Sequence, residues 1–236
     1  MIDPTTAAVQ EVIRSTYRFG FTWQLRAGTV RKSMRAADPT PVVLVSFDGD
    51  DVAVTVTSLV GPLALGARVA VAFVPPSGNY VVGFITGVPG QYVDHQSSTA
   101  ATIASNTGAA AAIFTTNPIF MLPHSVYEVS WRGRQSCAGG LGPSYFLNKD
   151  STAGALIYDW GVYHISLVNF DLPVFGHCYV ANTKDTFTKA TMCLNFNGGT
   201  GGQPVSFKAG NANKVAWMNV RYRGPFEDFP EAVQAY

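Results

Sequence analysis

The chain has 236 residues with 16 basic and 15 acidic side chains, so its formal net charge is only +1. This balance provides no long-range field that would draw the protein onto nucleic acid or an anionic membrane surface. Charged residues make up 13% of the chain, about half the share of an ordinary soluble domain. Because so sparsely charged a surface protects a free monomer poorly, we expect copies of the chain or partner proteins to cover much of it.

Cysteine usage and hydropathy indicate the folding environment. Cys137, Cys178 and Cys193 are too few and too widely spaced for a disulfide framework or a zinc knuckle. A reducing, cytosolic environment is the simpler interpretation. The first residues lack the basic and then apolar segments of a secretory signal, and no run approaches the ~18 apolar residues of a membrane helix. We therefore expect neither export by such a signal nor membrane insertion.

The first 20 residues predict a short amphipathic helix over positions 4–19. Pro4 suits the first helical turn, Tyr17 falls on the apolar face, and Arg14 and Arg18 lie four residues apart on the other side. A helix of this length is not stable alone. We expect it to pack on the following domain or on a neighbouring subunit, with Arg14, Arg18 and Tyr17 as candidate docking residues.

Residues 21–88 predict a small β-barrel. Short Val-rich runs are separated by turn signals such as Asp48-Gly49-Asp50 and Gly61-Pro62, a pattern typical of strands rather than helices. Five short strands at this spacing favour a closed barrel, because closure leaves no exposed sheet edge. The expected strands are Thr22–Arg31, Val42–Phe47, Val52–Thr57, Val69–Val74 and Tyr80–Ile85.

Four segments of this region carry a resemblance to a known family. They are Arg-Ala-Gly-Thr-Val at 26–30, Val-Leu-Val-Ser-Phe-Asp-Gly-Asp at 43–50, Gly-x-Arg-Val-x-Val at 66–71 and Gly-x-Tyr-Val-Val-Gly at 78–83. In this order they resemble the OB-like barrel found in structural proteins of tailed phages, particularly those infecting actinobacteria. The resemblance covers roughly residues 22–88 and implies a virion structural protein.

The composition shifts over residues 86–111 to small, nearly uncharged side chains. Such a stretch buries little apolar surface, so we expect residues 89–112 to form a linker or an extended arm. Residues 224–236 form an acidic tail with several aromatic side chains. We expect this tail to be irregular and to lie along a neighbouring subunit through Phe226, Phe229 and Tyr236.

Residues 113–223 predict a second all-β domain. Alternation is clearest at 127–132 and 215–222. Eight to ten strands in about 110 residues favour a sandwich of the jelly-roll type. The expected strands are Ile113–Thr116, Ile119–Leu122, Val126–Gly133, Ser144–Asn148, Ala155–Tyr158, Tyr163–Leu167, Val174–Ala181, Phe187–Phe196, Val205–Lys208 and Lys214–Tyr222.

Residues with catalytic or metal-binding potential do not combine into a site in the sequence. His177 and Cys178 are adjacent, so on a strand they face opposite sides and cannot form a nucleophile and base pair. The four histidines lack the spacing of metal ligands. The acidic segment from Asp48 to Asp51 predicts a hairpin turn. The carboxylates of the sandwich single out no glycosidase pair. We predict no catalytic, cofactor or metal residues.

Aromatic side chains make binding the better hypothesis. Trp131, Tyr158 and Trp160 are candidate glycan-binding residues, because aromatic rings stack on sugars. The competing interpretation is that most of these rings fill the core. The barrel is a poor site for single-stranded nucleic acid, since Arg68 is the only basic residue between Arg35 and residue 88.

The whole plan is similar to phage minor tail or capsid-decorating proteins. The resemblance implies a non-enzymatic protein located in the virion and assembled in the host cytoplasm. Its N-terminal part would dock to other virion proteins, while the sandwich would form a homotrimer and contact a host-surface glycan. The alternatives are a capsid-decoration or head-fibre protein, a carbohydrate-binding module and a sandwich hydrolase.

Overall fold

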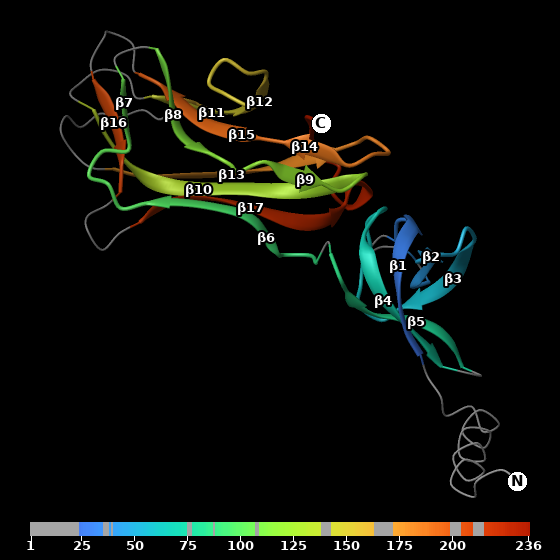
Figure 1. Cartoon of the computed structure of the whole chain (residues 1–236). Coiled ribbons are helices and arrows are strands. Elements are labelled where there is room, and N and C mark those ends of the chain that lie inside the picture. The colour runs from blue at the N-terminus through green and yellow to red at the C-terminus, as the bar shows by residue number, and fades with distance from the viewer. Residues whose placement is uncertain are drawn as a thin grey trace, which may run out of the picture. The chain divides into compact units, whose positions relative to one another are not determined.

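The computed structural model describes residues 24–34, 38, 40–74, 77–86, 88–106, 109–137, 143–162, 172–198, 204–209 and 215–236. The chain divides into two compact units, Met1–Val88 and Pro89–Tyr236 (Figure 1). The described part is all-β, as predicted, apart from one short 3₁₀ turn. The predicted helix at 4–19, with its candidate docking residues Arg14, Tyr17 and Arg18, lies outside the described residues. No helix in the described part of the chain is long and apolar enough to cross a membrane.

The first unit is a closed five-stranded barrel, which confirms that prediction. Its strands follow the order β1-β2-β3-β5-β4, and β4 pairs with β1 to close the sheet. β3 and β5 run parallel, while the other neighbouring pairs are antiparallel. The strands are β1 (Gln24–Lys32), β2 (Val42–Phe47), β3 (Ala53–Ser58), β4 (Arg68–Val74) and β5 (Gly78–Phe84).

Alternate residues of these strands fill the barrel with β-branched side chains. Val30, Val45 and Val71 are fully buried, as expected where one face of each strand points inward. The segment between β3 and β4 closes one end, because Leu63 is also fully buried and exchanges two backbone hydrogen bonds with Met34. Most of the core therefore comes from residues that the sequence pattern placed in strands, and Met34, Leu63 and Ala67 are added by connecting segments.

The second unit contains two sheets packed face to face. The first sheet has the neighbouring strands β13-β10-β17-β6, with β16 and then β7 extending from one end of β10 and β18 parallel to β13. Its strands are β6 (Tyr92–Ser98), β7 (Ala104–Asn106), β10 (Ser125–Cys137), β13 (Leu172–Asn182), β16 (Val205–Lys208), β17 (Ala216–Pro225) and β18 (Val233–Gln234).

The second sheet has the order β12-β11-β15-β8 and forms the other layer in Figure 1. Its strands are β8 (Ala110–Thr115), β11 (Ser144–Lys149), β12 (Leu156–Val162) and β15 (Met192–Asn197). A two-stranded ribbon of β9 (Ile119–Met121) and β14 (Thr188–Ala190) accompanies them, and η1 (Phe226–Asp228) follows β17. The expected strand Phe187–Phe196 is thus divided between β14 and β15, and the expected strand Tyr163–Leu167 lies outside the described residues.

Large aromatic side chains join the two sheets. Trp131 of the first sheet lies 4.8 Å from Tyr145 of the second between ring centroids, and Phe207 of β16 lies 6.3 Å from Phe114 of β8. The hydroxyl of Tyr145 donates to Oε1 of the buried Gln135 at 2.7 Å. The core therefore includes a polar contact whose donor and acceptor are both paired, which avoids the cost of burying an unsatisfied group.

Residues 89–112 do not form the expected linker. Much of this stretch forms strands β6 and β7 and the start of β8, and β6 pairs along β17 from Tyr92 to Ser98. The small polar side chains misled the prediction, because a strand needs only its backbone donors and acceptors to pair with a neighbour. This segment is therefore part of the second unit.

The acidic tail packs on its own unit through its aromatic side chains. Phe229 lies 5.4 Å from the ring of Tyr179, and Phe226 packs on the same small core around Val126. The backbone N–H of Tyr236 donates to Ala181, and its hydroxyl donates to the carbonyl oxygen of Thr191 at 2.9 Å. These aromatic side chains thus pack within the chain and remain partly exposed, and their contact with a neighbouring subunit stays a prediction.

Candidate functional site

The three aromatic residues predicted to bind glycan do lie together, but largely as a packing cluster. Trp131 is 1% exposed. Its ring lies 5.5 Å from that of Trp160, which lies 5.2 Å from that of Tyr158. The indole N–H of Trp160 donates to the carbonyl oxygen of His177 on β13 at 3.0 Å. Trp131 has no face open to a ligand, whereas Tyr158 and Trp160 are partly exposed where β12 approaches β13.

Cys178 is placed as a structural thiol. Its side chain is buried, whereas His177 is exposed, as expected for adjacent residues on one strand. Burial raises the pKa of Cys178 to about 12, with the charge of Glu128 adding to the effect. Burial also raises the pKa of Cys193. A thiol held in its protonated form does not act as a nucleophile.

We expect both buried thiols to be unreactive in the folded protein. In a Cys137→Ser variant at pH 8, a disulfide reagent that releases a coloured thiolate should label neither Cys178 nor Cys193, because both thiols are buried and burial raises the pKa of each. With a pKa of about 12, Cys178 is ionised in only about one molecule in 10,000. Both should react after unfolding in denaturant. Rapid labelling of a native thiol, followed by absorbance, would show that Cys178 or Cys193 is accessible and ionised.

The acidic turn after β2 is engaged by arginines. Asp48 accepts two hydrogen bonds of 2.5 Å from Arg68, and Asp50 accepts one of 3.0 Å from Arg26. The hydrogen bond from Arg68 lowers the pKa of Asp48. Because two of the carboxylates already face guanidinium groups, the turn is better described as a surface ion-pair cluster than as a cation site.

The remaining carboxylates are separated. Glu128 lies 3.6 Å from Nε of Arg223, and Asp185 lies 2.6 Å from Nε2 of His124. Asp159 accepts from the backbone N–H of Gly161 at 2.7 Å. In the part of the chain that the structure describes, no group of three or more His, Cys, Asp or Glu residues is placed to hold a metal ion.

The outer face of the first sheet carries a feature that sequence reasoning missed. In β17, the partly exposed Trp217 and Arg221 and the buried Asn219 share one face and alternate with the buried residues Ala216, Met218, Val220 and Tyr222 of the other face. The outer face of β10 carries Arg132 and Arg134. The signal was present in the alternation at 215–222, but the sequence does not say which of the two faces is covered by the second sheet.

A hollow of about 530 Å³ lies over β6 and β17. It is lined by Tyr92, His95, Trp217, Asn219 and Arg221. Nδ1 of His95 is hydrogen-bonded to Oδ1 of Asn219. The guanidinium of Arg221 lies 4.1 Å from the ring centroid of Tyr92 and also contacts its hydroxyl. Polar groups and one indole therefore line the same concave surface.

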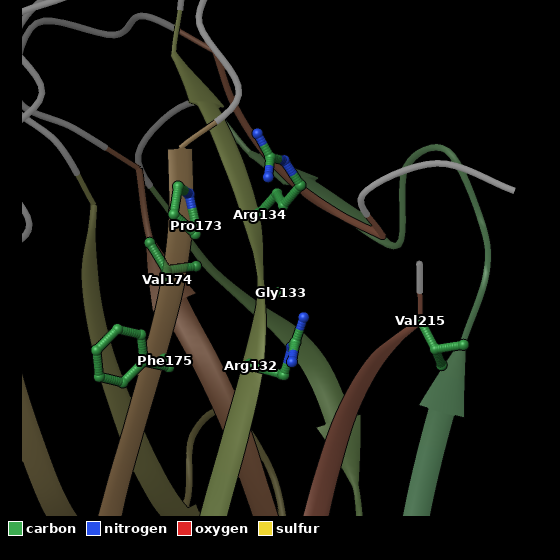
Figure 2. A pocket seen from close by; sticks show the side chains of 7 residues that line it. All are labelled: Arg132, Gly133, Arg134, Pro173, Val174, Phe175 and Val215. Atoms are coloured by element: carbon green, nitrogen blue, oxygen red, sulfur yellow. The ribbon is translucent and has the colours of Figure 1, made fainter. Parts of the chain in front are cut away.

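A second hollow, of about 320 Å³, adjoins this one. Arg132 and Arg134 of β10 line one side, and Pro173, Val174 and Phe175 of β13 line another, with Val215 before β17 (Figure 2). Arg132 and Trp217 are direct partners across the β10 and β17 pair. Each hollow is thus lined by one member of this cross-strand pair.

We call Arg134, Arg132, Trp217, Asn219, His95 and Arg221 the outer strip. Gly133 helps to position its two β10 arginines, because a Cβ atom there would overlap the ring of Phe207 in the core. The only carboxylate paired across from a strip residue in the β10 and β17 ladder is Glu128, opposite Arg221, and it faces Arg223. The strip therefore combines cationic, amide and aromatic groups.

Comparisons with known proteins identify no family. No protein-family model matches the chain, and no curated protein sequence matches it. Among solved structures, VP2 of infectious bursal disease virus in a subviral particle is 14% identical, with a TM-score of 0.36 over 91% of this chain and 55% of that one. The Gt strain of that virus gives 12% identity and a TM-score of 0.37 over 90% and 55%.

Eiger TNF from S. frugiperda is 9% identical, with a TM-score of 0.33 over 58% of this chain and 90% of that one. The chain thus spans about half the length of the viral chains that it matches. Proteins of virus particles are therefore among its structural neighbours. Identities and scores at this level carry no conclusion about function.

Proposed function

We propose that this chain is a non-enzymatic structural protein of a tailed-phage virion, of the minor tail or fibre type. The observation that carries the proposal is the coincidence of sequence resemblance and structure over residues 22–88. The four segments that resemble phage barrels supply strands β1, β2, β4 and β5 of a closed barrel. Its order β1-β2-β3-β5-β4, with β3 parallel to β5, supports an OB-like barrel.

The second unit is proposed to be a jelly roll. Omitting the short strands, the chain order of its eight main strands is β6, β8, β10, β11, β12, β13, β15 and β17. The first sheet then has the first, eighth, third and sixth strands as neighbours, and the second sheet has the second, seventh, fourth and fifth. This is the arrangement of two Greek keys wrapped into a sandwich, an architecture suited to display on a particle.

Docking is proposed to use the barrel and the residues before it. Several large aliphatic side chains of the barrel are well exposed: Leu25, Val52, Leu59 and Ile85 are each 50% or more accessible. A partner in the virion would remove this apolar surface from water. Arg14, Arg18 and Tyr17 remain the proposed docking residues of the N-terminal segment.

Labelling of purified particles tests the location. An antibody against this chain, detected by electron microscopy, should bind the tail or its fibres. Label on the head would favour the capsid-decoration or head-fibre alternative. Particles that contain no copy of the chain by mass spectrometry would contradict a virion role altogether.

Self-assembly is tested on the isolated chain. We propose a homotrimer, so light scattering after size exclusion should give three times the 25.2 kDa of one chain. The trimer would cover part of a surface that carries unusually few charges. A stable monomer that binds glycan would instead favour the carbohydrate-binding module.

A further inference from the structure

We propose that the outer strip binds an acidic oligosaccharide. This inference rests on the outer face of the second unit and does not depend on a virion role. Sugar recognition would come from Trp217 and the polar groups beside it. Recognition of the acidic substituents would come from the arginines at both ends. These residues are distinct from Trp131, Tyr158 and Trp160, the aromatic residues that the sequence predicted to bind glycan.

Trp217 lines the hollow over β6 and β17. This side chain is partly exposed on a concave surface rather than in the core. An exposed indole presents a flat apolar face, which stacks on the C–H face of a pyranose ring. In β-sandwiches the hollowed face of a sheet offers such a platform without the cost of opening the core.

His95 and Asn219 form a hydrogen-bonded pair in the same hollow. Since Nδ1 of His95 bonds to Oδ1 of Asn219, the amide Nδ2 of Asn219 and Nε2 of His95 have no partner among the described residues. A neutral imidazole that donates from Nδ1 accepts at Nε2. The exposed His95 therefore offers an acceptor to a sugar hydroxyl, and Asn219, which is only 6% exposed but lines the hollow, offers a donor.

Positively charged side chains lie at both ends of the outer strip. Arg132 and Arg134 lie on the same face of β10 (Figure 2), and Lys208 lies opposite Arg134 on β16. Arg221 stands at the other end of the strip, where it is held over Tyr92. Guanidinium groups form paired hydrogen bonds with carboxylate, sulfate and phosphate groups. This concentration of positive charge, in a chain whose net charge is +1, favours an anionic ligand over a neutral one.

The outer strip is long enough to bind an oligosaccharide of several sugar units. Arg134 and Arg221 correspond to positions 134 and 128 along β10, because Arg221 is the partner of Glu128. Six residues of strand span about 20 Å, which accommodates several sugar units. The site lies on the face of a sheet rather than at its open edge, so it does not offer the backbone pairing through which extended peptides bind.

Nucleic acid fits the strip less well. Sequence-independent binding of single strands uses a series of stacking aromatics along a basic groove. In the outer strip Trp217 is the one partly exposed indole, while Arg221 already covers the ring of Tyr92. One stacking position with hydrogen-bonding groups around it suits a sugar better than successive bases.

The test is calorimetric titration of the full chain with three defined probes. They are a heparin tetrasaccharide, an oligogalacturonate and a neutral cello-oligosaccharide. We expect binding of at least one acidic probe and about tenfold weaker binding of the neutral one. Preference for heparin would assign the anion as sulfate, and preference for oligogalacturonate would assign it as carboxylate. Absence of binding to both acidic probes would overturn the proposal.

Substitutions in the outer strip test whether the acidic probe binds there. Trp217→Ala and Arg132→Gln should each weaken binding of the acidic probe about tenfold, and Trp217→Phe should retain most of it. Arg26→Gln removes the same charge from the other unit and should leave binding unchanged. An equal loss with Arg26→Gln would indicate charge attraction alone and overturn the site. Arg132 is exposed, so its variant tests the proposal even if Trp217→Ala fails to fold.

Two further outcomes would assign a different ligand to the outer strip. Tighter binding of a dT oligonucleotide than of either acidic sugar, lost in Trp217→Ala, would assign the strip to nucleic acid. A fall in oligomer mass for Arg132→Gln, with no sugar binding by the original chain, would assign the strip to contact with a second copy. Either result would contradict a glycan site.

Discussion

Replacing Trp131 by alanine is expected to destabilise the second unit by about 3–5 kcal/mol. Its side chain is 1% exposed and packs against Tyr145, Trp160 and Phe207, with ring centroids at 4.8, 5.5 and 6.2 Å. Removing the indole leaves a cavity between two sheets that cannot close without moving both. A loss of this size is a large fraction of the ~5–15 kcal/mol that keeps a domain folded. Urea unfolding of the full chain, followed by circular dichroism, measures it.

The matched control is Trp217→Ala. It makes the same chemical change in the same unit, but on the outer face, so we expect a loss of no more than about 1 kcal/mol. Trp131→Phe should cost clearly less than Trp131→Ala. It keeps a ring in the core and removes an indole N–H that is buried without a partner among the described residues. Equal losses at Trp131 and Trp217 would contradict the assignment of the two faces.

The contrast between these two tryptophans shows what the sequence could and could not predict. Both lie in strands that were recognised from their alternation. Alternation with a period of two residues separates the two faces of a strand, but it does not show which face is buried. Partner strands decide this. Trp131 points at Tyr145 in the second sheet, whereas Trp217 is paired with Arg132 on the outside. Trp131 was therefore predicted as a ligand platform, and the outer strip was missed.

The barrel was predictable because the signals for its strands and turns lie close together in the sequence. Its strands are separated by turns that carry Gly, Pro and Asp, and their Val-rich runs fill the interior. β6 was missed because its pairing with β17 joins Ser98 to Ala216, far apart in the sequence. Gly176 is a second feature that depends on strands far apart in the sequence. A Cβ there would come within 2.7 Å of Nε1 of Trp131, a constraint that is visible only once β10 and β13 are side by side.

Replacing Asn182 by aspartate is expected to cause a second large loss of stability, and one that depends on pH. Asn182 is fully buried. Its Nδ2 donates to the carbonyl oxygens of Leu122 and Thr186 at 2.9 and 3.0 Å. Its Oδ1 accepts from the backbone N–H of Lys184 at 3.3 Å and from the hydroxyl of Thr188 at 3.2 Å. The amide therefore ties the end of β13 to the segments before β10 and β14.

A carboxylate at this position would replace two donors by an anion facing carbonyl oxygens, at a cost of about 3–5 kcal/mol at neutral pH. Burial and these carbonyls both raise the pKa of the introduced carboxyl above its unfolded value of about 3.9. The folded state then binds the proton more tightly than the unfolded state. Stability relative to the original chain should therefore fall by about 1.4 kcal/mol per pH unit from about pH 4 up to the raised pKa.

Urea midpoints of the variant and the original chain, compared at pH 4, 5.5 and 7, measure this difference. Asn197→Asp introduces the same group at an exposed position of β15 and should show no such trend. A stability difference for Asn182→Asp that stays constant with pH would mean that the carboxylate is solvated, and hence that the junction opens to water. A difference that widens towards neutral pH would show that this one amide holds the strand ends together in a site closed to solvent.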